Sequence, residues 1–422
     1  MCIVKIAIIV RRLDVKGGTQ RQALSLANEL KKRGHEVTLY AFFYSAEKCY
    51  PDLLTPFKAV VLDPAVARPP VFPRLANIPL LRYLATIVAI RHETKSAKAL
   101  ARLIDPDTEL LNPHDRVAHR AAAFFKRRLR DIPSVWNTND THSMLWGVDK
   151  LADIDPAYDQ PWWKRAGYRI RDRYENARYI GAQDAIVVVD EFNCGLMKNY
   201  FGRDAIVVRN GPNMDHFAYR ERTPPSAAVR LLTSGIFFPH RRFEDAIEAV
   251  KILRNEGINA ALNIIGDPES DPAYAQKLRT LVAGQGLENH IHFLGKVSEE
   301  ELLRQYQTGD IYLYPHHLQS DGLSPFEALA TGMPIIVSRS AGAHEVVRDR
   351  ETGLIVNPKD PAGIARAVRD LCEHPALYRK LSAEGSAFVR ANFSWSRYAD
   401  GMLAVYESVS KHQIPTSPPV GG

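Results

Sequence analysis

Short apolar runs alternate with segments of helical periodicity through the first half of the chain. The run at residues 5–10, KIAIIV, predicts a buried strand, and residues 17–34 predict a helix because their apolar residues fall on one face. Gly34 supplies the glycine that commonly follows a helix end, and residues 35–42 predict a second strand. This order forms a βαβ unit, so we expect a parallel sheet with a right-handed crossover. Four more strands are expected at residues 108–115, 133–140, 184–190 and 205–210.

The same alternation restarts after residues 221–230, a polar, proline-rich segment that we interpret as an interdomain linker. The strands beyond it are expected at residues 230–237, 260–267, 291–297, 311–317 and 334–339, and the helices at residues 243–257, 274–286, 299–309 and 325–332. This pattern predicts a second doubly wound sheet. We therefore expect an α/β protein with two Rossmann-like domains, each built on a doubly wound parallel sheet.

Chain length supports this division, because 422 residues are about twice the size of an ordinary domain. The first domain is expected at residues 1–215 and the second at 225–394. A helix at about 395–411 is expected to leave the second domain, and the proline-rich residues 412–422 are expected to form a disordered tail. Hydrophobic residues make up 45% and charged residues 24%, a mixture typical of globular proteins with a large core.

Cysteine spacing and apolar runs exclude further classes of protein. The four cysteines lie far apart with no C-x-x-C pair, so neither a zinc site nor a disulfide framework is expected. The apolar run at the N-terminus indicates a strand rather than a signal peptide. The stretch at residues 78–90 is interrupted by Arg82 and falls short of the roughly 20 residues that cross a bilayer. We expect a cytoplasmic protein, with peripheral contact at the inner membrane face left open.

Basic residues are concentrated in the first domain. Residues 1–215 hold 33 Lys and Arg against 24 Asp and Glu, whereas the remainder holds 22 against 24. Two segments, 116–131 and 161–180, interleave basic residues with apolar ones at helical spacing. They are interpreted either as solvated helix faces over an ordinary core or as a surface for anionic membrane lipid. Since no nucleic-acid-binding module is visible, we expect no nucleic-acid partner.

The sharpest chemical signal lies in residues 317–338, HLQSDGLSPFEALATGMPIIVS. Ser324, Pro325 and Glu327 fit the start of a helix, with Ser324 as its N-cap, and Gly332 fits its end. The glycine turn before this helix leads a strand end to a helix N-terminus, where free backbone amides can bind a diphosphate. The alternative is structural, with Glu327 completing a capping box with Ser324.

These residues resemble the signature of the family-4 retaining glycosyltransferases, whose GT-B fold consists of two Rossmann-like domains facing a central cleft. The family carries a glutamate, seven residues and a second glutamate, followed by an alanine and a Gly-x-Pro. Glu327, Ala328 and residues 332–334 match the second part. The resemblance implies that Glu327 binds the ribose hydroxyls of a nucleotide. Gln319 stands at the first glutamate's position without its charge, so Asp321 is an alternative wherever a mechanism needs a carboxylate.

The resemblance covers nearly the whole chain. It implies that Gly17 and Gly18 let the backbone approach the donor phosphate and sugar. It places His114 toward the donor sugar, and Asn139 and Asp140 on the acceptor side. Three further segments match the family. Residues 208–217 resemble its hinge, and residues 340–347 resemble a loop near the donor. Residues 393–406 resemble the helix that crosses back to complete the first domain.

The phosphate-binding segment departs from the family pattern. The family commonly presents Gly-Arg and, a few residues later, Lys-Gly, whereas Ile236 stands here in place of that arginine. Arg241 or Arg242 would supply the lysine's charge, and arginine can bind phosphate through two hydrogen bonds. The alternative for both arginines is a solvated helix start, because a helical segment follows at once.

Backbone amides would complete the donor site implied by the resemblance, at Gly322, Leu323 and Ser324. Together with an arginine they would stabilise a leaving diphosphate, so neither a metal nor a cofactor is expected. Residues 153–155 match the Asp-x-Asp of metal-dependent transferases, but they fall in a predicted loop and are discounted.

We therefore expect a retaining glycosyltransferase that moves a hexose-type sugar from a nucleotide-diphosphate sugar to a glycan, lipid-linked or small-molecule acceptor. Retention is expected through same-face attack, with the leaving phosphate accepting the acceptor's proton. Two alternatives stay open. One is a sugar-nucleotide isomerase on the same fold, and the other is a non-catalytic sugar-nucleotide-binding subunit, which the departures at Gln319 and Ile236 would suit.

Overall fold

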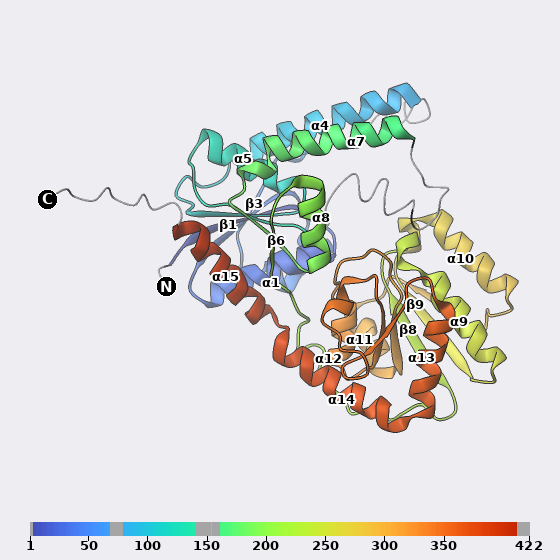
Figure 1. Cartoon of the computed structure of the whole chain (residues 1–422). Coiled ribbons are helices and arrows are strands. Elements are labelled where there is room, and N and C mark those ends of the chain that lie inside the picture. Colours follow the sequence, from blue (N-terminus) through green and yellow to red (C-terminus); the bar gives the residue numbers. More distant parts are fainter. Residues whose placement is uncertain (1–2, 68–78, 140–152, 154–160, 412–422) are drawn as a thin grey trace.

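The computed structural model describes residues 3–67, 79–139, 153 and 161–411, with the backbone alone at residues 79–87 and 411. It contains two α/β domains, which lie side by side in Figure 1. Each is built on one parallel sheet, of seven strands in the first and six in the second. This confirms the expected fold class.

The first sheet consists of β1 (Lys5–Leu13), β2 (Glu36–Tyr44), β3 (Ala59–Val61), β4 (Leu110–His114), β5 (Val135–Asn137), β6 (Ala185–Val188) and β7 (Ile206–Val207). Its order is β3-β2-β1-β4-β5-β6-β7. The helices of this domain are α1 (Gly18–Lys32), α2 (Pro51–Leu54), α3 (Pro64–Ala67), α4 (Pro79–Ala101), α5 (Ala118–Arg128), α7 (Trp162–Arg178), α8 (Glu191–Phe201) and α15 (Trp395–Lys411), with short 3-10 helices at Ala46–Lys48 and Ile180–Ala182.

Strand β1 lies between β2 and β4, and helices cover both of its faces. Its alternate residues Ile6, Ile8 and Val10 join the core formed with α1 and α15. Ala7 and Ile9 join the core formed with α4 and α5. A parallel strand buried on both faces has a continuous apolar sequence, which is the pattern that residues 5–10 show.

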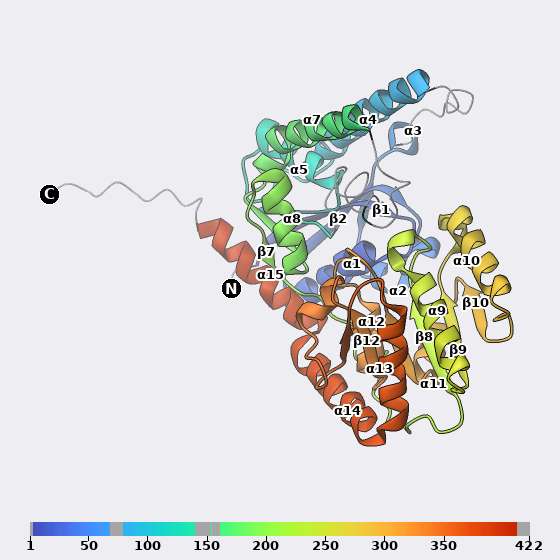
Figure 2. The same cartoon turned by 45° about the vertical axis from the view of Figure 1, so that its right-hand side comes forward.

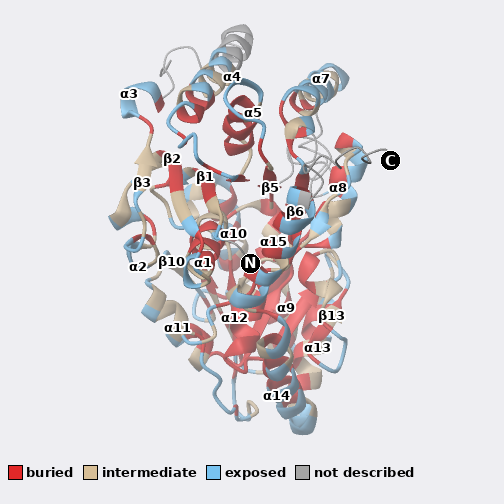
Figure 3. Ribbon diagram, turned by 90° about the vertical axis from the view of Figure 1, so that its left-hand side faces the viewer, coloured by how far each residue is buried: buried red, intermediate tan, exposed pale blue. Residues whose placement is uncertain are grey.

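The second sheet consists of β8 (Val229–Ser234), β9 (Ala260–Ile265), β10 (Ile291–Gly295), β11 (Ile311–Tyr314), β12 (Ile335–Ser338) and β13 (Leu354–Val356), in the order β10-β9-β8-β11-β12-β13. Its helices are α9 (Phe243–Asn255), α10 (Pro272–Gly284), α11 (Glu299–Thr308), α12 (Ser324–Ala330), α13 (Pro361–Glu373) and α14 (Pro375–Asn392), with 3-10 helices at Pro239–Arg241, Pro268–Ser270 and Gly342–Glu345. Buried residues gather in both sheets and on the helix faces turned toward them (Figure 3).

The chain enters the second domain before the predicted linker begins. Phe217 is fully buried in the second core. Arg222 is also buried, inside the segment interpreted as the interdomain linker at residues 221–230, and β8 already begins at Val229. The guanidinium of Arg222 fixes this segment to the second domain by donating hydrogen bonds to the carbonyl oxygens of Tyr306, Gln307, Gly309 and Thr331.

Helix α15 follows α14 and lies against the first domain, where it packs on α1 (Figure 1). Its apolar residues join the first core. Two tyrosines anchor it: Tyr398 Oη accepts a hydrogen bond from Asn137 Nδ2 at 2.7 Å, and Tyr406 Oη donates one to Asn112 Oδ1 at 3.0 Å. The chain therefore connects the two domains twice, near Phe217 and before α15.

Helices α4 and α7 lie on the outer side of the first domain (Figures 1 and 2). Buried charges tie them to α5. Arg120 donates hydrogen bonds to both carboxylate oxygens of Glu175, at 2.7 and 2.8 Å, and lies 3.5 Å from Glu93. Burial alone would raise the pKa of Glu175, but hydrogen bonds from His119 and Arg120 lower it to about 2. Part of the basic charge in residues 116–131 is therefore internal and does not form a solvated face.

Candidate active site

The residues predicted to bind the donor follow the carboxyl ends of central strands in both sheets. Strand β1 leads to Gly17 and Gly18, β4 ends at His114, β8 leads to Arg241 and β11 leads to Gln319. In each sheet the strand order reverses between the two strands concerned, β1 and β4 or β8 and β11. Ligands of open α/β sheets bind at such a switch point.

Glu327 lies in α12, and its carboxylate is bound by side chains from other elements. Leu323, not the predicted Ser324, is the N-cap residue, and no side chain caps the helix. The capping box is therefore not formed. Glu327 Oε1 accepts a hydrogen bond from Arg21 of the first domain at 3.1 Å, and Oε2 accepts one from Tyr306 Oη at 3.1 Å. Burial raises the pKa of Glu327, and the Arg21 cation opposes that rise.

The two arginines after β8 have different surroundings. Arg242 donates two hydrogen bonds to Asp245, at 2.5 and 2.9 Å, and one to Glu244 at 3.0 Å. Its charge is therefore already compensated within its own helix start. Arg241 contacts the ring of His316 at 3.0 Å, and its buried Nε has no partner among the described residues. Of the two, Arg241 has donors available for a phosphate.

The turn before α12 requires glycine. Gly322 has a φ of +74°, and a Cβ there would lie 2.3 Å from Tyr314 Oη. The backbone therefore passes closer to Tyr314 than any side chain would allow. Gly322, Leu323 and Ser324 are half-buried.

Gln319 and Asp321 point into different environments. Gln319 Nε2 donates to Ser320 Oγ at 3.0 Å, and Gln319 Oε1 is buried without a partner in the described part of the chain. Asp321 is fully buried and accepts a hydrogen bond from Arg209 at 3.2 Å, and its backbone amide donates to Asp190 at 2.7 Å. The Asp321 carboxylate thus joins the two domains through Oδ2, while Asp321 Oδ1, like Gln319 Oε1, has no partner among the described residues.

His114 is buried at the end of β4, and its ring Nε2 lies 2.9 Å from Asn112 Oδ1. An amide oxygen only accepts, so Nε2 carries the proton and Nδ1 presents a lone pair without a described partner. Burial lowers the pKa of His114 to about 3, so the ring is neutral at ordinary pH. On the acceptor side, Asn139 Nδ2 donates to Gln22 at 2.9 Å while its Oδ1 is unpaired among these residues, and Asp140 lies outside the described residues.

The glycine pair after β1 is placed at the start of α1. Gly17 is the N-cap residue, and a Cβ there would lie 2.6 Å from Gln20 Oε1. A Cβ at Gly18 would meet no described atom within 4 Å, so this position borders open space. Gly18 therefore leaves room beside the backbone at the start of α1.

Contacts between the domains involve residues that the sequence pattern did not single out. Arg21 binds Glu327 and also Glu299, at 2.7 Å. Arg209 binds Glu345 at 2.6 Å as well as Asp321. A weak signal existed for Arg21 alone, because it follows Gly17 by one helical turn. These partners come from distant parts of the chain, so no local spacing could identify them.

Asp153 is the one described residue of the discounted Asp-x-Asp, and it contacts His317 and Lys359 of the second domain. Hydrogen bonding from His317 lowers the pKa of Asp153. Within the described ranges, no group of three or more His, Cys, Asp or Glu could hold a metal ion. Nor does any helix there have the length and apolarity needed to cross a bilayer.

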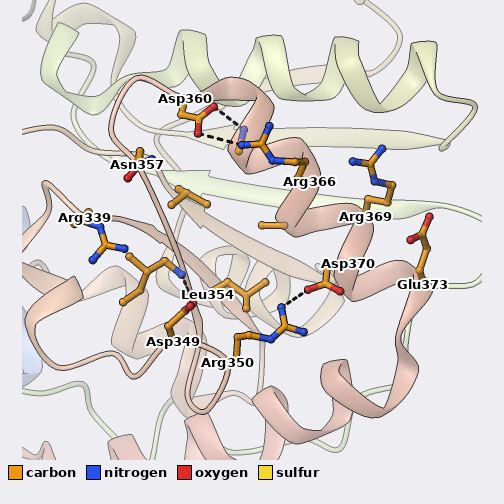
Figure 4. Close-up of a pocket in the computed structure, with 14 residues that line it drawn as sticks. Arg339, Asp349, Arg350, Leu354, Asn357, Asp360, Arg366, Arg369, Asp370 and Glu373 are labelled. Carbon is orange, nitrogen blue, oxygen red and sulfur yellow. Dashed lines mark hydrogen bonds and ion pairs between the residues drawn. The ribbon is translucent and has the colours of Figure 1, made fainter.

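A groove of about 500 Å³ lies away from these residues, between β13 and α13 (Figure 4). None of the residues predicted to bind the donor lines it. Three of its four arginines pair with carboxylates: Arg350 with Asp370 at 2.5 Å, Arg366 with Asp360 at 3.4 Å and Arg369 with Glu256 at 2.9 Å. Because these charges compensate one another, the groove offers no strong anion site.

Curated relatives are glycosyltransferases at low identity. The D-inositol 3-phosphate glycosyltransferase of Geodermatophilus obscurus is 28% identical over 60% of each chain. The glycogen synthase of Mycobacterium tuberculosis is 28% identical over half of each chain. The chain thus spans only 50–60% of the length of these two relatives. The phosphatidyl-myo-inositol mannosyltransferase of Mycobacterium leprae is 24% identical over 94% of each chain.

Solved structures share the fold. Sucrose-phosphate synthase from Thermosynechococcus elongatus superposes with a TM-score of 0.74 at 18% identity, covering 97% of this chain and 100% of that one. Anabaena HepE in complex with UDP-glucose gives a TM-score of 0.70 at 14% identity, covering 96% and 99%. Two family models match adjoining parts of the chain, Glycosyltransferase Family 4 at residues 16–216 and Glycosyl transferases group 1 at residues 219–388. The chain therefore belongs to the family-4 glycosyltransferases of group 1, with the GT-B fold.

Proposed function

We propose that the protein is a retaining glycosyltransferase that moves a hexose-type sugar from a nucleotide-diphosphate sugar to an acceptor. The observation that carries this proposal is a set of buried polar atoms without partners among the described residues. They belong to residues singled out from the sequence: His114 Nδ1, Asn139 Oδ1, Arg241 Nε, Gln319 Oε1 and Asp321 Oδ1. Buried polar atoms are almost always hydrogen-bonded, so these positions suit a ligand rich in hydroxyl and phosphate oxygens.

The donor is proposed to bind mainly to the second domain. Glu327 would accept hydrogen bonds from the ribose hydroxyls, since each carboxylate oxygen retains acceptor capacity beside its present partner. Arg241 and the backbone amides from Gly322 to Ser324 would bind the diphosphate. Support comes from a neighbour of the same fold, Anabaena HepE, whose structure contains UDP-glucose.

The proposed reaction needs charge stabilisation at the leaving phosphate and acceptors around the sugar. Arg241 would offset the charge that develops on the β-phosphate as the glycosidic bond breaks. His114 is neutral, so its Nδ1 would accept a hydrogen bond from a sugar hydroxyl and would not donate a proton. Gln319 Oε1 would accept another. In same-face attack, the leaving phosphate takes the acceptor's proton, and neither a metal nor a cofactor is proposed.

The acceptor is proposed to be a glycan, a lipid-linked molecule or a small polyol bound at the first domain, near Asn139. Relatives named for inositol phosphate and phosphatidylinositol acceptors support a polyol or lipid-linked class. We place the protein in the cytoplasm, with peripheral contact at an anionic inner membrane face. That contact is supported by α7, which exposes Trp162, Trp163, Ile170 and Tyr174 beside basic residues.

Nucleotide binding and turnover test the proposal together. Incubation with a panel of nucleotide-sugars should release a nucleoside diphosphate slowly from one of them. Glu327→Ala should weaken nucleoside diphosphate binding by about 1–3 kcal/mol, the value of a charged hydrogen bond, as measured by calorimetry. Glu351→Ala, at an exposed ion pair of the same domain, is the control and should bind normally. Unchanged affinity in folded Glu327→Ala would refute the ribose assignment.

The two alternatives predict different products in the same assay. An isomerase would convert the sugar-nucleotide without releasing nucleoside diphosphate. A non-catalytic binding subunit would bind the nucleotide and turn over none of the panel. Release that accelerates with an added polyol or glycan acceptor would support transfer over both.

A further inference from the structure

Arg21 joins the first domain to the carboxylate assigned to the nucleotide. It lies in the first turn of α1, three residues after Gly18. One of its terminal nitrogens is 3.1 Å from Glu327 Oε1, and the other is 2.7 and 2.8 Å from the two oxygens of Glu299. The guanidinium also lies 4.9 Å above the ring of Tyr50. Four separate contacts therefore fix its position.

The site needs this cation for an electrostatic reason. The side chain of Glu327 is only 6% exposed, and that of Arg21 is 14% exposed. A carboxylate buried to this degree keeps its charge only if a cation or several donors lie beside it. Its other described hydrogen bond comes from Tyr306, a neutral donor, while Glu299 adds a second negative charge nearby. Arg21 is thus the cation in direct contact with Glu327.

We propose that Arg21 is a positioning residue for the donor, holding Glu327 ionised and oriented so that it can accept the ribose hydroxyls. This inference rests on the proposed role of Glu327. Arg21, in the first domain, would thus contribute to nucleotide binding through Glu327, in the second domain. The nucleotide would bind with full affinity only when α1 lies against α12.

The proposal predicts a change in pH dependence as well as in affinity. Without the cation, burial and the charge of Glu299 favour the protonated form of Glu327. A protonated carboxyl group accepts hydrogen bonds from the ribose hydroxyls less strongly than a carboxylate does. Binding should then recover as pH rises and Glu327 ionises. Charged and titratable groups from both domains face Glu327: Arg21, Tyr50, His216, Glu299, Tyr306 and Tyr312.

The experiment compares UDP binding by the whole protein and its variants from pH 6 to 9. Arg21→Met keeps the length of the side chain and removes its charge. Affinity relative to the unmodified protein should fall at least about 10-fold at pH 6 and return to within about 3-fold at pH 9. Taking this ratio cancels the titration of UDP. Arg21→Lys, which keeps the charge, should give a ratio that stays flat with pH.

Two controls separate positioning from simple loss of structure. Arg33→Met removes another ion-paired arginine, the C-cap residue of α1 that is bound to Glu29 and Asp400, and should bind UDP normally. In a Glu327→Gln background, Arg21→Met should produce no pH-dependent change, because the titrating group is absent. Transfer assays should show a raised donor KM with a smaller change in kcat.

Each outcome bears on one claim. A pH-dependent ratio that disappears with Glu327→Gln supports the positioning role. The positioning role is overturned if Arg21→Met binds UDP at every pH as tightly as the unmodified protein, or more tightly. That result would indicate that Arg21 competes with the ribose for Glu327. If the unmodified protein binds UDP and other nucleoside diphosphates at no pH, the proposed function fails first, and the inference fails with it.

Discussion

Replacing Arg209 by methionine should destabilise the protein in a pH-dependent way. Arg209 bridges the domains, with its nitrogens 3.2 Å from Asp321 and 2.6 Å from Glu345. Asp190 also lies here, accepting a hydrogen bond from the Asp321 amide. Methionine would leave three neighbouring carboxylates without this cation, and the side chain of Asp321 is only 1% exposed.

The magnitude follows from the burial of Asp321. Breaking a buried ion pair by removing one partner costs about 3–5 kcal/mol, and we take the lower end because Arg209 is itself 19% exposed. With an unfolding entropy of about 2.1 cal/mol/K per residue, a domain of about 200 residues would lose roughly 7 °C in unfolding temperature for 3 kcal/mol. If the whole chain unfolds together, the shift would be roughly half as large.

The sign of the pH dependence is set by the direction of the pKa shift. Burial raises the pKa of Asp321 well above its ordinary value, and Arg209 opposes that rise. A raised folded-state pKa means that the folded protein binds more protons than the unfolded chain, so stability falls as pH rises toward it. Arg209→Met raises this pKa further, and the loss should therefore be larger at pH 8 than at pH 5.

Calorimetry at pH 5 and pH 8 measures both effects. The double variant Arg209→Met, Asp321→Asn removes the buried charge and should recover most of the loss and its pH dependence. Arg304→Met, which breaks an exposed ion pair with Glu301, should leave the unfolding temperature unchanged. Equal losses at the two pH values, or a loss no larger than that of Arg304→Met, would refute the electrostatic reasoning.

Two further predictions concern the reaction and the membrane. Chelation with EDTA should leave turnover nearly intact, because an arginine and backbone amides are proposed to stabilise the leaving group; loss of activity that Mn²⁺ restores would contradict this. The variant Trp162→Ala, Trp163→Ala should sediment less with anionic vesicles than the unmodified protein, and high salt should weaken the charge contribution of about 1 kcal/mol per basic residue. Ile206→Ala, at an exposed position on β7, is the control, and equal absence of binding to anionic and neutral vesicles would refute membrane contact.

The sequence predicted the architecture well because strands and helices leave local periodic signals. Residues 5–10 have the continuous apolar character of a strand buried on both faces, and they form an interior strand of the first sheet. The helix and strand series after residue 230 was likewise visible, and the structure shows it as β8 to β12 with α9 to α12. Local composition indicated an interdomain linker at residues 221–230, but Arg222 is buried in the second domain. Carbonyl oxygens from distant segments accept its hydrogen bonds.

Individual roles in the candidate site depended on tertiary contacts. The spacing of Ser324 and Glu327 allowed a capping box, but an arginine 306 positions away in the sequence binds that glutamate instead. Local spacing predicted the same phosphate-binding role for Arg241 and Arg242. Only the structure shows that neighbouring carboxylates compensate the charge of Arg242. Hydrophobic periodicity is a property of neighbouring residues and can be read along the chain. A buried charge without a partner costs free energy because it has lost its hydration. Which residue becomes its partner depends on how the two domains pack in three dimensions.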